Sequence, residues 1–147
     1  MATSGQRLSR SARWALATLA LALSALLATA AGLKPDPRGF GTHEQLGLPQ
    51  CAFQAVTGVP CPSCGMTTAF AWSVRGRPDR AWRANPAGSL LAPLCGLLVL
   101  WLLAVVALGR PLGTRSVDRP LMIVTVAAVA LSLGAWTFQW ILWRVLG

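Results

Sequence analysis

Three long apolar runs, separated by shorter polar stretches, set the hydropathy pattern of the chain. They cover residues 14–33, 87–109 and 121–143. A helix of about 20 apolar residues is long enough to cross the hydrocarbon core of a bilayer, which is about 30 Å thick. The second and third runs hold no charged residue, and Pro86 and Pro120 precede them, where a helix does not need the missing N–H. The pattern predicts three transmembrane helices.

The first run also has the features of a secretory signal. Arg7, Arg10 and Arg13 precede it, and residues 28–30 read Ala-Thr-Ala, which fits the A-x-A pattern at which such signals are cleaved. Its uncharged length of about 20 residues is at the long end for a signal and sufficient for a span. A retained anchor is therefore favoured over cleavage after Ala30. Either outcome sends the following segment across the membrane.

The segment between the first two runs is predicted to be a loop up to about Cys64, followed by a short interfacial or re-entrant helix and a linker at 75–86. Residues 45–74 carry no charge, so a fourth crossing is the alternative. Prolines and glycines in this stretch would leave backbone groups without hydrogen bonds in lipid, which argues against that alternative. The chain is thus expected to comprise 1–33 as a basic tail and first span, 34–86 as a cysteine-containing loop with a short helix, and 87–147 as a two-helix transmembrane hairpin.

Composition and charge agree with a membrane protein. The 147 residues are 54% hydrophobic and 12% charged, which leaves too little polar surface for a soluble domain, so the predicted fold class is all-α and integral to the membrane. The net charge of +9 comes from basic residues in the gaps between apolar runs, where headgroup contact and topology explain them. We expect a multi-pass protein of the cell membrane with the lipid bilayer as its partner. Nucleic acid is not an expected partner, and a second membrane protein or another copy of the chain stays open.

Catalytic motifs are not evident in the sequence. The four acidic residues all lie in loops beside basic residues, and the chain has one histidine. It contains no G-x-S-x-G, no H-E-x-x-H and no P-loop. A hydrolase is therefore unsupported, and we do not expect an enzyme.

The residues that carry chemistry are three cysteines, Cys51, Cys61 and Cys64. The last two form a C-x-x-C pair, a spacing typical of a metal site, a disulfide or a redox centre. Pro62-Ser63 and the apolar residues at helical spacing downstream predict a helix that begins near Ser63. Cys64 would then lie in its first turn, where backbone amides and the helix dipole stabilise a thiolate.

Three interpretations of these cysteines follow from the residues. In the first they form a structural centre, either a disulfide pair with one thiol left over or a brace of the loop. In the second, His43 completes a zinc site with Cys51, Cys61 and Cys64, because three Cys and one His are a common tetrahedral set for Zn²⁺. In the third, Cys61 and Cys64 are a membrane thiol–disulfide redox centre that exchanges electrons with a partner. The N-terminal segment is expected to export the loop to the outer face, where disulfides persist.

The sequence around the cysteines resembles a known family. The similar residues are Cys51-Ala52-Phe53, the run TGVPCPSCGMT at 57–67, Gly76 and Asn85-Pro86. They resemble an uncharacterised family of small bacterial membrane proteins that is known only as a domain of unknown function. The resemblance covers about residues 50 to 100 and implies a few helices in a bacterial inner or plasma membrane, with no established activity. The residues expected to have structural roles in this region are Gly58, Pro60, Pro62, Gly65, Thr67, Asn85 and Pro86.

One position departs from the family pattern. Members usually carry Arg directly after the Thr of the motif, and this chain has Thr68 there. If that Arg pairs with a thiolate or a lipid phosphate, the role is lost in this chain or passes to Arg75 or Arg77.

Asn85 itself is expected to cap the helix of the second span.

Overall fold

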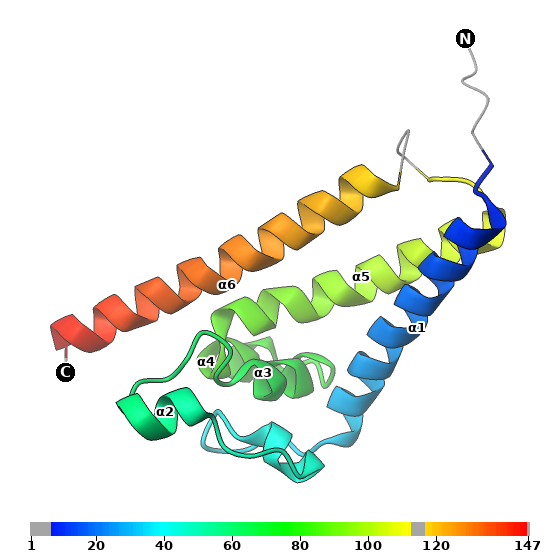
Figure 1. Cartoon of the computed structure of the whole chain (residues 1–147). Coiled ribbons are helices and arrows are strands. Elements are labelled where there is room, and N and C mark those ends of the chain that lie inside the picture. Colours follow the sequence, from blue (N-terminus) through cyan, green and yellow to red (C-terminus); the bar gives the residue numbers. More distant parts are fainter. Residues whose placement is uncertain (1–6, 113–116, 147) are drawn as a thin grey trace.

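Three long helices give the protein its membrane-spanning character. The computed structural model describes residues 7–112 and 117–146, and every regular element within these ranges is helical. Three of the helices are long and apolar enough to cross a membrane, namely α1 (Arg10–Gly32), α5 (Pro86–Leu108) and α6 (Asp118–Leu146). The predicted all-α fold with three spans is confirmed (Figure 1).

The segment between α1 and α5 folds into four short elements. They are the 3₁₀ helix η1 (Thr42–Leu46) and the helices α2 (Ala52–Thr57), α3 (Met66–Ser73) and α4 (Pro78–Ala84). At 1.5 Å per residue none of them is long enough to cross a bilayer, so this segment forms no fourth span. We call residues 34–85 the lobe.

Helix α3 is the short helix expected after the cysteine pair, and the other short elements were not predicted. The expected continuous loop is interrupted by η1 and α2, and the expected linker at 75–86 contains α4. Helix α2 ends at Gly58, whose φ of 70° forms a left-handed C-cap, and α4 begins with Pro78. Helices of six and seven residues are too short to show a hydrophobic period, which is why the pattern missed them.

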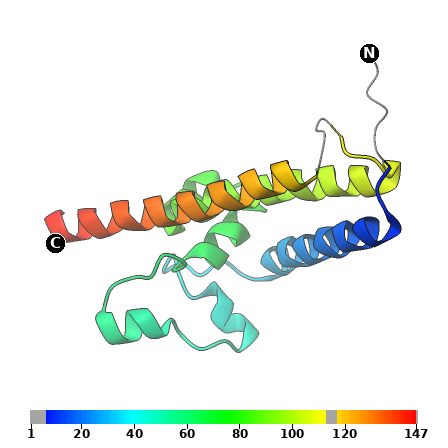
Figure 2. The same ribbon diagram turned by 45° about the horizontal axis from the view of Figure 1, so that its top comes forward.

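Helix α5 is the centre of the fold. Helices α1 and α6 pack against it, and α3 and α4 pack near its start (Figures 1 and 2). Helix α1 runs antiparallel to α5, because the Leu8 amide donates to the Gly109 carbonyl at 2.9 Å and the Arg13 guanidinium donates to the Val106 carbonyl at 2.8 Å. The lobe therefore lies at the opposite end of the molecule, where α1 ends and α5 begins (Figure 1).

A small apolar core joins α1 to α5. Its buried members are Leu16 and Ala20 from α1 and Leu102 and Val105 from α5. Ala20, Leu102 and Val105 are fully enclosed, and the small Ala20 side chain allows the two helices to approach closely. The first helix is thus an integral part of the packed structure.

Helix α3 approaches α5 closely at Gly88. A Cβ atom placed on Gly88 would lie 2.8 Å from the Ala69 Cβ and 3.0 Å from the Met66 Sδ. Protein interiors do not tolerate such contacts without displacement, so a larger residue would push the helices apart. The contact fixes α3, and the cysteine turn before it, at the start of α5.

Arg75 ties the lobe to the end of α1. Its Nη1 donates to the carbonyls of Ala30 at 3.2 Å and Ala71 at 2.7 Å, and its Nη2 donates to those of Ala31 at 2.8 Å and Leu33 at 2.7 Å. The last carbonyls of a helix have no partners within it and carry partial negative charge. Arg75 satisfies three acceptors at this end of α1 and places a positive charge beside them.

Candidate thiol centre

Cys51, Cys61 and Cys64 come together on the lobe. Cys51 is the N-cap residue of α2, and the other two lie in the turn that precedes α3. All three are free thiols and partly buried, and their Sγ atoms lie within 4.8 Å of one another. We call this cluster the thiol centre.

The turn from Cys61 to Cys64 brings the Sγ atoms of these two residues close together. The Cys64 amide donates to the Cys61 carbonyl at 3.0 Å, and the Cys61 amide donates to the Cys64 Sγ at 3.2 Å. The two Sγ atoms are 3.2 Å apart. The Cys64 thiol also lies 3.7 Å from the Oε1 of Gln54, which connects the turn to α2.

Gly65 follows the turn and must lack a side chain. Its φ of +79° lies in the left-handed region, and it is the N-cap residue of α3. A Cβ atom there would lie 2.7 Å from the Gly39 carbonyl oxygen and would overlap the Ala84 carbonyl oxygen. The turn therefore packs directly on two backbone segments of the lobe.

Asn85 connects the cysteine turn to α5. Its Oδ1 accepts from the Gly88 amide at 2.8 Å, so it is the N-cap residue of the span. Its Nδ2 donates to the Cys64 carbonyl at 2.9 Å and to the Pro62 carbonyl at 3.3 Å, and the residue is 2% exposed. The cap was expected from the sequence, whereas the bonds to the cysteine turn were not, because nothing in the local pattern points 21 residues upstream.

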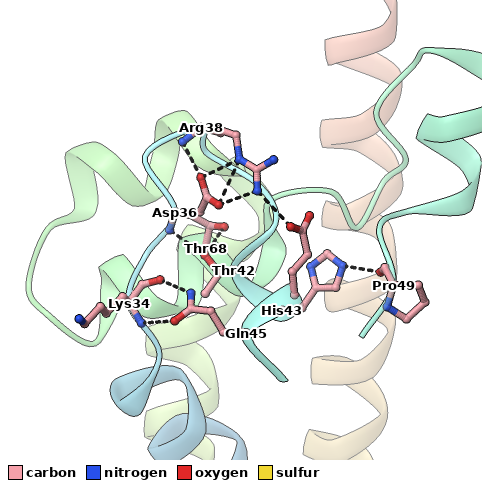
Figure 3. Close-up of polar contacts among 9 residues, drawn as sticks. Lys34, Asp36, Arg38, Thr42, His43, Gln45, Pro49 and Thr68 are labelled. Atoms are coloured by element: carbon pink, nitrogen blue, oxygen red, sulfur yellow. Dashed lines mark hydrogen bonds and ion pairs between the residues drawn. The ribbon is translucent and has the colours of Figure 1, made fainter. Parts of the chain in front are cut away.

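His43 lies beside the thiol centre and outside it. Its Nε2 is 3.2 Å from the Pro49 carbonyl oxygen (Figure 3). Among the described residues, only the three cysteines form a cluster of this kind that can hold a metal ion. His43 nevertheless lines the same pocket of about 260 Å³ as Cys51 and Cys64.

The thiols differ in acidity. The Gln54 backbone amide, followed by the Cys61 thiol, lowers the pKa of Cys51 from its ordinary value. Burial, followed by the hydrogen bond with Cys61, raises the pKa of Cys64 to about 12. The prediction that Cys64 lies in the first turn of a helix and forms a stabilised thiolate is wrong, because α3 begins at Met66. The amide that favours a thiolate acts on Cys51, at the start of α2.

The other motif residues lie at helix ends or in contacts between the lobe and the long helices. Gly58 closes α2, the Pro60 carbonyl accepts from the Trp136 indole of α6 at 3.2 Å, and Pro86 is the first residue of α5. Thr67 lines an apolar pocket between α1 and α3. Pro62 contributes the carbonyl that Asn85 binds.

Thr68 is fully buried in the lobe and does not face the thiol centre. Its Oγ1 lies 2.7 Å from that of Thr42, which is also fully buried and accepts from a backbone amide of the preceding loop (Figure 3). The arginines considered as replacements for an Arg at this position are engaged elsewhere. Arg75 binds the end of α1, and Arg77 lies 3.5 Å from Asp79. Sequence reasoning missed Thr42 because its partner is 26 residues away.

Comparison with known proteins finds a match to one family model, and the function of that family is unknown. Residues 51–99 match a family model described as "Protein of unknown function (DUF2752)". The matched segment contains the thiol centre, α2, α3, α4 and the first part of α5. No curated protein and no solved structure matches the chain.

Proposed function

We propose that this multi-pass membrane protein uses Cys51, Cys61 and Cys64 as a structural centre that braces the lobe and binds one Zn²⁺ ion. The observation that carries the proposal is the isolation of α2. None of its residues is buried, and within the described part of the chain it packs against no other helix. A six-residue helix is too short to be stable alone in water. Its attachment therefore depends on few groups, and Cys51 at its start is one of them, beside Gln54.

A link through Cys51 would fix α2 in place. Cys61 and Cys64 belong to one turn, so a bond between them would close that turn alone. A link from Cys51 to the turn joins α2 to the segment that Asn85 holds against α5. A metal ion bound by all three sulfurs makes this link and leaves no thiol over.

The arrangement of the sulfurs suits Zn²⁺. Thiolates about 2.3 Å from a tetrahedral Zn²⁺ are about 3.8 Å apart, and the three Sγ atoms lie within 4.8 Å of one another. The lowered pKa of Cys51 favours its thiolate, and a bound cation displaces the proton of Cys64. Water or His43, which lines the adjoining pocket, would complete four ligands.

The proposed location is the cell membrane, with the thiol centre on the outer face. A retained α1 with its basic residues inside would export the lobe to that side. Among the described helices, α6 packs against α5 alone, its Trp136 indole also reaches the Pro60 carbonyl of the lobe, and it leaves Met122, Ile123 and Val126 exposed. This apolar face suits lipid, a second membrane protein or another copy of the chain.

The test is a metal assay on the full-length protein purified in detergent. We expect about one equivalent of Zn²⁺ per chain, lost in Cys51→Ser, Cys61→Ser and Cys64→Ser and kept in Cys95→Ser, the matched control in α5. Limited proteolysis within 52–57 should accelerate when the metal is removed. Three thiols that alkylate freely, no metal, and unchanged proteolysis would contradict the proposal.

A thiol–disulfide centre is the second candidate, and the Cys61–Cys64 Sγ distance of 3.2 Å favours it. The two thiols would then form a disulfide as they reduce a disulfide of a partner protein, through a mixed disulfide with one of its cysteines. The same preparation distinguishes the two functions. A reducible Cys61–Cys64 link without metal, and a mixed disulfide on Cys61 in Cys64→Ser, would support exchange.

A further inference from the structure

A second pocket of about 340 Å³ lies on the lobe, apart from the thiol centre. Its walls come from the loop after α1, with Asp36 and Arg38, and from α3 and α4, with Trp72, Arg80 and Arg83. Three of these five side chains are cationic. The pocket is therefore suited to an anion, provided that its charges are not already paired.

The loop side of the pocket offers no free positive charge. The Arg38 guanidinium donates to both carboxylate oxygens of Asp36, with the shortest distance 2.7 Å, and to Glu44 at 3.1 Å (Figure 3). The Arg38 guanidinium also lies 5.2 Å from the centre of the Phe40 ring. These contacts fix Arg38 and leave it no unpaired charge to offer.

The helix side of the pocket keeps its positive charge. The Arg80 guanidinium lies 4.6 Å from the centre of the Trp72 ring, a cation–π contact that orients it and leaves its N–H groups available. Within residues 7–112 and 117–146, neither Arg80 nor Arg83 forms an ion pair. Arg77 differs, because it pairs with Asp79 and does not line the pocket.

The pocket lies close to the ends of two helices that are long and apolar enough to span a membrane. Helix α1 ends at Gly32, shortly before Asp36, and α4 ends at Ala84, shortly before α5 begins at Pro86. Both walls are thus within a few residues of the ends of membrane-spanning helices. Trp82 on α4 is 54% exposed, as expected for an aromatic side chain at the membrane interface.

We propose that Arg80 and Arg83 bind the phosphate of an anionic phospholipid in this pocket. Guanidinium groups bind phosphate oxygens through paired N–H donors, and basic residues beside a membrane favour anionic lipids. The site is separate from the thiol centre and does not depend on the metal proposed there. It fixes the lobe against the membrane surface through a second, polar contact.

The test is native mass spectrometry of the full-length protein in detergent, titrated with dioctanoyl-phosphatidylglycerol. We expect a retained adduct, with dioctanoyl-phosphatidylcholine and inorganic phosphate unable to compete at the same concentration. Arg80→Gln/Arg83→Gln should weaken binding on the order of 30-fold, or about fivefold for each arginine. Arg77→Gln, the matched control on the same segment, should bind like the original protein.

Several results of the same experiment would contradict the lipid proposal. Equal binding of phosphatidylcholine, or an unchanged affinity in the folded double variant, would overturn the proposal. Competition by inorganic phosphate would assign the pocket to a free anion and overturn the lipid assignment. If the glutamine variant does not fold, Arg80→Lys/Arg83→Lys keeps the charge and removes the planar donor pair. Undiminished affinity in that variant would exclude the proposed paired recognition.

Discussion

The Asn85 amide group binds the Cys64 carbonyl at 2.9 Å while its oxygen caps the span that begins with the next residue. A single buried side chain therefore joins the thiol centre to the start of α5. The position of the cysteine turn and the beginning of the membrane helix are set by the same residue.

Replacing Asn85 should destabilise the protein, and two variants probe its cap and its two donated bonds. Asn85→Ala removes the cap and both donors, and we expect a loss of about 1–2 kcal/mol for the cap alone, with a further loss for the turn. Asn85→Asp keeps the cap acceptor and removes the donors to Cys64 and Pro62. Because an Asp carboxylate oxygen would face the carbonyl oxygens of Cys64 and Pro62 in a buried site, denaturant unfolding in detergent should rank the original protein above both variants. Equal stability of all three would contradict the bridging role.

Gly65→Ala should disturb the thiol centre more than a comparable change elsewhere. The added Cβ meets both a left-handed backbone and the carbonyl oxygens of Gly39 and Ala84. Gly76→Ala is the control, because Gly76 has a φ of +67° and no atom within 4 Å of the added Cβ. The control should lose about 1–2 kcal/mol from backbone strain, and Gly65→Ala should lose more. Similar unfolding midpoints for the two variants would show that packing at Gly65 is loose.

The buried hydroxyl pair of Thr42 and Thr68 should show energetic coupling. Thr68→Val leaves the enclosed Thr42 hydroxyl with the Asp36 amide and without the Thr68 hydroxyl, and we expect a cost of about 1–3 kcal/mol. Thr42→Val also removes the acceptor for the Asp36 amide, so it should cost more. A double-mutant cycle on unfolding free energies measures the pair, and strict additivity would mean that the hydroxyls do not interact.

The titration of Cys64 should make the metal-free protein less stable in alkali. Its folded-state pKa is raised to about 12 from an ordinary value of 9.0, so the protonated thiol favours the fold. This contribution is complete below pH 9.0 and is lost as the pH rises toward about 12. Cys51 has a lowered pKa, so its contribution is lost as the pH falls through that value.

The measurement is stability as a function of pH in the presence of a chelator. Cys64→Ser, which does not titrate in this range, should give a flatter curve between pH 9.0 and about 12 than the original protein. Parallel curves would show that Cys64 is not buried as described.

The sequence predicted the parts of the fold that depend on long regular patterns. The apolar runs identified α1, α5 and α6, because an uncharged apolar stretch of about 20 residues is rare outside membrane spans. The N-cap at Asn85 was also accessible, since it depends on residues within one turn. The three cysteines were expected to act together from their common loop, and their Sγ atoms do converge.

Long-range contacts could not be predicted in this way. The Thr42–Thr68 pair and the bonds from Asn85 to the cysteine turn connect residues 26 and 21 positions apart. The start of α3 was misplaced because Pro62-Ser63 has the composition of a helix start, whereas Gly65 provides the real one. That choice depends on the carbonyls of Gly39 and Ala84, which a local pattern does not contain.

The contact of Arg75 with α1 has a consequence for processing of the chain. A signal peptidase that cut after Ala30 would have to reach a peptide bond whose carbonyl Arg75 binds, at a residue only 3% exposed. The cut would also sever the covalent link to the part of α1 that holds Leu16 and Ala20, and would put the Ala30 carbonyl, one of the acceptors of Arg75, on the cleaved piece. In the folded chain the Ala28-Thr29-Ala30 sequence is thus poorly accessible to such a protease, which favours a retained first helix, and that retention stays a prediction.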